Sequence, residues 1–161
     1  MRETRSIIET VTTVLNDVFY PIILMGFDEP FAAGEIEAYL EKLVAIADEG
    51  IRTRRRHVVI VTNDPLKVSA AGRRRVANAV ALHMTPEQVD VTLASFLPID
   101  STLVRGVLTA FRWFSPETIK TLRAVDSMES AFREALIALE AHGTPFAGDK
   151  LALRRALRIE D

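Results

Sequence analysis

Residues 57–65 read HVVIVTNDP, a short run of β-branched residues that ends in turn-forming ones. Valine, isoleucine and threonine favour strands, and a strand that is apolar on both faces is typical of the interior of a parallel sheet. Asn63, Asp64 and Pro65 favour a turn, because the residue before a proline is driven away from the helical region. The stretch therefore predicts the central parallel strand of an α/β domain.

Helical periodicity lies on both sides of this strand. Residues 33–50 place apolar side chains at helical spacing and end at Gly50, a common residue at helix ends. Residues 69–83 predict a second helix that is broken at Thr85, Pro86 and Glu87. The next strand is expected over residues 89–96, since apolar and polar positions alternate there.

Residues 97–114 continue from that strand, through a polar Asp-Ser-Thr turn, into a helix with an aromatic end. We expect Ser101 to cap this third helix. A weak strand follows within residues 118–125, and the tetrapeptide at residues 126–129, Asp-Ser-Met-Glu, is a start signal for a last helix that closes at Gly143.

Two further strands precede the first helix. Residues 7–14 are β-branched and half polar, as in a strand near a sheet edge, and Asn16 with Asp17 indicates a turn. Residues 18–27 are almost continuously apolar, with a bulge or an edge-facing position expected at Pro21, which has no N–H to donate. The two strands are predicted to form a hairpin.

This alternation predicts an α/β fold: a mixed, mostly parallel sheet of about five strands with an N-terminal hairpin and four helices. We assign residues 1–143 to the α/β domain and residues 144–161 to a C-terminal extension with a short amphipathic helix. That helix either packs back on the domain or docks on another chain, and the sequence favours neither.

The composition narrows the class of protein. The chain has 161 residues, 48% of them hydrophobic, which suffices for the core of one domain. It has no cysteine and a net charge of −2, so we expect a cytoplasmic protein that does not bind nucleic acid. No apolar run approaches the roughly 20 residues of a membrane span, and no signal peptide is expected.

Four polar residues are expected at the edge of the sheet where parallel strands end. Asp28, Asp64, Asp100 and Ser101 each follow a predicted strand, and ligands of open α/β sheets bind at this edge. The three carboxylates could hold a magnesium ion through oxygen ligands. The alternative is that they end strands and cap turns, which is the commoner role of aspartate.

Ser69 also has two interpretations. As the N-cap of the second helix, its hydroxyl would accept a hydrogen bond from a backbone amide. As a phosphorylation site, it would place about two negative charges at the positive end of a helix, near Arg73, Arg74 and Arg75.

The aromatic end of the third predicted helix is a candidate interface. Phe111, Trp113 and Phe114 cannot all follow one narrow inward stripe, because adjacent helical residues point about 100° apart. An exposed aromatic ring beside Arg112 is typical of an interface anchor. The alternative is that these rings pack against the following strand.

The arrangement resembles a known family, the STAS-like domains of the SpoIIAA type, which border in fold on a group of lipid-binding proteins. The resemblance covers residues 7–143. It rests on the order of elements, on the strand and turn at residues 59–64, on the helix over residues 101–113 and on the closing pattern at residues 125–132.

This resemblance implies a regulatory function. In the best-understood members, which act on anti-sigma kinases, a serine at the start of the helix after the central strand is phosphorylated and partner binding changes with it. Ser69 matches that position, with KVSAAG at residues 67–72 where the family has Asp-Ser-Ser-Gly.

Three function classes follow. The first is a non-catalytic regulatory or protein-interaction module, whose partner would be a kinase, another regulator or a second copy of the chain. The second is a binding domain for a small apolar or lipid-like ligand. The third is a magnesium-dependent, phosphate-handling enzyme built on Asp28, Asp64 and Asp100. The chain has no nucleophile elbow, glycine-rich phosphate loop or zinc motif, which favours a protein without catalysis or cofactor.

Overall fold

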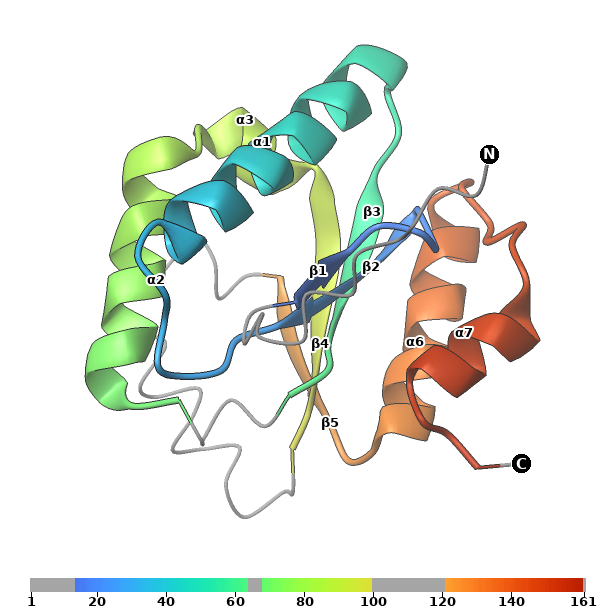
Figure 1. The fold of residues 1–161 in the computed structure, drawn as a ribbon. Helices are drawn as coiled ribbons and strands as arrows, with labels where there is room; N and C mark the ends of the chain where they lie inside the picture. The colour runs from blue at the N-terminus through green and yellow to red at the C-terminus, as the bar shows by residue number, and fades with distance from the viewer. Residues whose placement is uncertain (1–13, 64–67, 100–120, 161) are drawn as a thin grey trace, which may run out of the picture.

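A single five-stranded sheet forms the centre of the protein (Figure 1). The computed structural model describes residues 14–63, 68–99 and 121–160. The strands lie side by side in chain order: β1 (Val14–Asn16), β2 (Ile22–Gly26), β3 (His57–Val61), β4 (Thr92–Pro98) and β5 (Leu122–Val125). The described helices are α1 (Glu35–Thr53), α2 (Ala70–His83), α3 (Pro86–Asp90), α6 (Met128–Ala141) and α7 (Lys150–Ala156).

The directions of the strands confirm the predicted fold class. β1 runs antiparallel to β2 as a hairpin, and β2, β3, β4 and β5 run parallel to one another. The stretch that begins at His57 forms β3, which lies in the middle of the sheet. The α/β fold with a mixed, mostly parallel sheet is therefore as predicted.

Helices cover both faces of the sheet, with α1, α2 and α3 on one side and α6 and α7 on the other (Figure 1). Because side chains of a strand alternate between faces, neighbouring residues of β2 and β3 enter different cores. Ile22 and Val58 pack with α6, whereas Ile23 and Val59 pack with Ile46 of α1. Burial on both faces explains why these strands read as continuous apolar runs.

The predicted end of the first helix at Gly50 is wrong. Gly50 is buried inside α1, which continues to Thr53 and ends at Arg54 in a left-handed conformation. A Cβ atom at Gly50 would lie 2.7 Å from Cγ1 of Val91, so this glycine permits close packing instead of ending the helix.

The predicted start of the fourth strand at Val89 is also wrong. Residues 86–90 form the short helix α3, and β4 begins only at Thr92. Thr85 caps α3, accepting the backbone N–H of Gln88 at 3.2 Å while the Gln88 side chain accepts the N–H of Thr85 at 2.9 Å. This reciprocal pair is a capping box, which starts a helix where the sequence reading placed only a break.

The hairpin also differs from its predicted bounds. β1 includes Asn16, where a turn was predicted, and β2 begins at Ile22 because residues 17–21 form the turn. Residues 7–13 of the first predicted strand lie outside the described residues. The predicted fifth strand is β5, which begins at Leu122.

The C-terminal helix packs back on the domain. Leu153 of α7 and Leu157, which follows the helix directly, are buried in the same core as Leu139 of α6 and Ile60 of β3. Arg154 forms an ion pair with Glu129 at the start of α6, at 2.9 Å. The sequence left open whether this helix packs on its own domain or docks on another chain, and in the structure it packs on its own domain.

Candidate functional site

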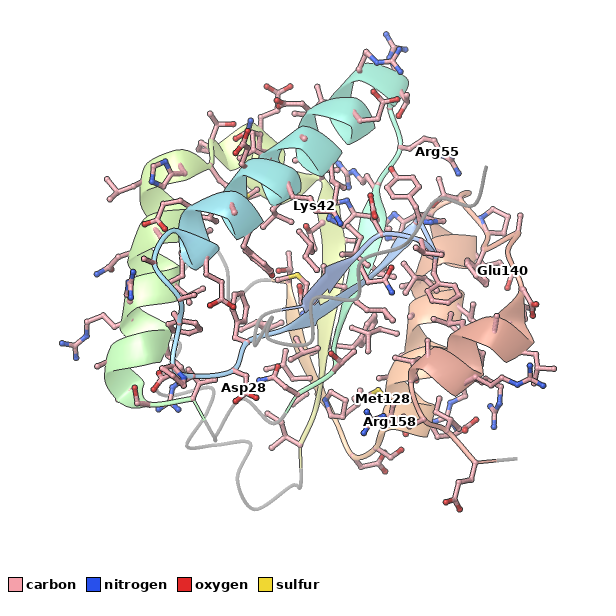
Figure 2. All side chains as sticks on the ribbon, in the orientation of Figure 1. Asp28, Lys42, Arg55, Met128, Glu140 and Arg158 are labelled. Atoms are coloured by element: carbon pink, nitrogen blue, oxygen red, sulfur yellow. The ribbon has the colours of Figure 1, made fainter. Side chains whose placement is uncertain are left out.

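The carboxyl ends of the parallel strands meet at one edge of the sheet, where two connections lie together. The chain leaves β2 through Asp28 and Glu29, and it leaves β3 through Thr62 and Asn63. Figure 2 shows Asp28 at this edge. We define the candidate site as Glu29, Ser69 and Gly72, because their side chains and backbone are in direct contact.

The end of β3 holds the connection after β2 in place. The side chain of Asn63 accepts the backbone N–H of Phe27 at 3.1 Å and donates to the carbonyl of the same residue. Thr62 donates its backbone N–H to the carbonyl of Met25 at 2.7 Å. These backbone and side-chain bonds continue the pairing of β2 with β3 as far as Phe27, two residues before Glu29.

Ser69 is the N-cap of α2, and its hydroxyl has two partners. The Oγ atom accepts the backbone N–H of Gly72 at 3.0 Å, as a capping serine does. It also donates a hydrogen bond to Oε1 of Glu29 at 2.7 Å. The same carboxylate oxygen accepts the backbone N–H of Ser69 at 3.2 Å. A carboxylate therefore lies at the N-terminus of α2, where the helix dipole favours negative charge.

Gly72 lets the carboxylate approach this closely. A Cβ atom at Gly72 would lie 1.6 Å from Oε1 of Glu29 and 2.8 Å from its carboxyl carbon. The two groups cannot occupy that space together, so any larger residue at this position must move the carboxylate. The turn before α2 is fastened as well, because Arg73 donates to the carbonyl of Val68 at 2.6 Å.

The start of α6 shows how a serine cap looks without such a long-range partner. Ser127 accepts the backbone N–H of Ser130 at 3.1 Å, and Asp126 accepts hydrogen bonds from the hydroxyls of Ser130 and Ser127. The hydrogen bond from Ser130, and to a smaller extent the one from Ser127, hold the pKa of the Asp126 carboxyl below its usual value. This network confirms the predicted start signal and stays within one turn of chain.

Of the other residues that the sequence predicted as sites, Asp28 is the one that lies in the described part of the chain. Asp28 is exposed, and Asp64, Asp100 and Ser101 lie outside the described residues, as do Phe111, Arg112, Trp113 and Phe114. Across residues 14–63, 68–99 and 121–160, no group of three or more acidic or histidine side chains is arranged to hold a metal ion.

The sequence predicted neither the contact of Glu29 with Ser69 nor the role of Gly72 beside it. Glu29 is forty residues from Ser69, so nothing local in the sequence connects them. The one available signal was Gly72 itself, a helix-disfavouring residue within the first turn of a predicted helix.

Comparisons with known proteins found no relative from which a function could be assigned. No protein-family model, curated protein or solved structure matches the chain. Within the described residues, no helix combines the length and the apolar character needed to cross a bilayer.

A double-mutant cycle tests the contact between Glu29 and Gly72. Glu29→Gln is expected to destabilise the protein by about 1 kcal/mol, because it removes a charged acceptor at the helix N-terminus. In the Gly72→Ala background the same change is expected to cost close to nothing, since the added methyl group has already displaced the carboxylate. Urea denaturation of the four proteins measures both values, and additive effects would contradict the contact.

Proposed function

We propose that the protein is a non-catalytic regulatory module of the STAS-like type, which binds another protein and is controlled by phosphorylation of Ser69. The observation that carries the proposal is the position of Ser69 at the N-cap of α2, the helix that follows the central strand β3. Ser69 is exposed, so a kinase can reach its hydroxyl. The order of strands and helices supports the same class.

The contact with Glu29 gives phosphorylation a defined structural effect. When a kinase phosphorylates Ser69, the serine oxygen forms a bond to the γ-phosphorus of ATP, and the bond between that phosphorus and the β-phosphate oxygen breaks to release ADP. The hydroxyl proton passes to a base of the kinase. That proton is the one now donated to Glu29 at 2.7 Å. The product carries about two negative charges beside a carboxylate at the same helix end.

Repulsion then favours departure of Glu29, with the phosphate taking over the backbone amides at the start of α2. Glu29 belongs to the connection between β2 and α1, so this connection loses one of its attachments. A surface that includes residues 27–34 would therefore differ between the phosphorylated and the unphosphorylated protein. A partner protein could bind one of these two forms in preference to the other.

Hydrogen exchange on Ser69→Asp tests the structural step without a known kinase. We expect faster exchange of backbone amides in residues 27–34, and a similar increase for Glu29→Gln. Ser127→Asp is the matched control, since it changes the serine cap of α6 and leaves Glu29 untouched. Unchanged exchange in residues 27–34 of Ser69→Asp would contradict the proposed coupling.

Isolation of the protein from its own cells tests the regulation. Mass spectrometry is expected to find phosphate on Ser69, and Ser69→Ala and Ser69→Asp baits are expected to retain different amounts of one protein partner. Absence of the phosphopeptide, together with identical partners for both baits, would overturn the proposal.

A further inference from the structure

We propose that the protein binds a small phosphate monoester with hydroxyl groups in a pocket at the amino edge of the sheet. The pocket has a volume of about 370 Å³ and lies between the end of α1, the residues before β3, and α3. Figure 2 shows Arg55 there and Asp28 at the other end of the sheet, so this pocket is separate from Ser69. The proposal does not depend on the proposed function.

Three consecutive arginines, Arg54, Arg55 and Arg56, line the pocket and are exposed. In the part of the chain that the structure describes, none of them forms an ion pair with an acid, whereas Arg52 is bound by Glu49 at 2.9 Å. The lining of this one hollow therefore includes three positively charged side chains that can donate hydrogen bonds.

The backbone that presents these arginines is fixed. Arg54 and Arg55 donate their N–H groups to the carbonyls of Ile51 and Gly50, at 3.2 and 2.9 Å. The guanidinium of Arg55 also lies over the ring of Tyr20, 5.4 Å from its centroid. A site held in this way loses less conformational freedom when a ligand binds.

The wall at Gly50 is closely packed and has a polar group beside it. A Cβ atom at Gly50 would lie 2.8 Å from the carbonyl oxygen of Arg55 and 3.9 Å from the Tyr20 hydroxyl. That hydroxyl is buried, has no hydrogen-bond partner among the described residues, and belongs to a residue that does not line the pocket. The packing around Gly50 therefore leaves no room for a side chain at this position of the wall.

The charges select the class of ligand. A phosphate monoester has three terminal oxygens and nearly two negative charges, so it can bind more than one guanidinium group. A carboxylate has two oxygens, and one arginine in bidentate contact uses both of them. Glu87 and Asp90 line the same pocket and can only accept hydrogen bonds when ionised. They therefore fit hydroxyl groups on the organic part of the ligand, and the volume suits a small metabolite.

Calorimetric titration with glycerol 3-phosphate, inorganic phosphate, glycerol and L-aspartate tests the proposal. We expect saturable binding of glycerol 3-phosphate, at least several-fold weaker binding of inorganic phosphate, and no binding of glycerol. Binding of L-aspartate in preference to glycerol 3-phosphate would overturn the phosphate assignment, and absence of any binding at millimolar concentrations would overturn the site.

Variants distinguish this pocket from a general attraction between the protein and anions. Arg54→Gln with Arg56→Gln is expected to weaken glycerol 3-phosphate roughly tenfold or more, because charged hydrogen bonds are lost. Arg155→Gln, on the exposed surface of α7, is the matched control and is expected to leave affinity unchanged. Equal losses in both proteins would overturn the pocket.

Glu87→Gln tests the hydroxyl contacts. It is expected to weaken glycerol 3-phosphate and to leave inorganic phosphate unchanged or slightly stronger, because one repulsive carboxylate is removed. Equal strengthening of both ligands would overturn the assignment of hydroxyl groups.

Discussion

Leu153→Ala is expected to lower the free energy of unfolding by about 2–5 kcal/mol, as truncation of a fully buried leucine does. Leu153 is 0% exposed and packs in the core formed by α6, α7 and one face of the sheet. Removal of its side chain leaves a cavity that the surrounding side chains fill only in part. Urea denaturation with a constant slope measures the change.

Leu151→Ala is the matched control on the same helix. Leu151 is 45% exposed, so the same substitution is expected to change stability by less than about 0.5 kcal/mol. Similar values for the two variants would mean that α7 does not pack through its Leu153 face in solution. The pair therefore tests whether the C-terminal segment belongs to the core of the domain.

Acid is expected to destabilise the protein through His57 by about 3 kcal/mol between pH 7 and about pH 4. His57 is 1% exposed; its Nε2 shares a hydrogen bond of 2.9 Å with Thr92, and its Nδ1 has no partner within residues 14–63, 68–99 and 121–160. Burial lowers its pKa from 6.5 to about 4. The unfolded chain therefore takes up a proton at a higher pH than the folded chain does.

The free energy of unfolding therefore decreases as the pH falls, because the unfolded chain binds the proton first. Stability is fully present above about pH 6.5 and falls as the pH approaches 4, because protons then favour the unfolded state. His57→Phe is expected to remove most of this slope whatever its stability at neutral pH, and urea denaturation across the range measures it. His83→Gln and His142→Gln are the controls, since both histidines are exposed. An unchanged slope in His57→Phe would contradict the assignment.

The order of the described strands was predictable because it depends on local periodicity. Alternating strand and helix patterns with short connections allow few arrangements besides a mostly parallel sheet, and β3 lies at its centre as expected. Ser69 could be placed at a helix start for the same reason, since a capping serine acts on an amide three residues away.

Boundaries that depend on distant contacts were not predictable. Gly50 resembles a helix end in sequence, and only Val91, forty-one residues later, explains why α1 passes through it. The helix α3 was missed because Pro86 was interpreted as a break, although proline at the first position of a helix is favourable when a capping box precedes it.

The candidate site follows the same division. The serine at the start of the helix after the central strand could be predicted from the sequence, because hydroxyl caps and β-branched runs are local signals. The contact of Glu29 with that serine, and the room that Gly72 leaves for it, come from the packing of distant segments. Parallel strands place the connections that follow them at one edge of the sheet, so residues far apart in sequence meet there, and no local pattern specifies which side chains touch.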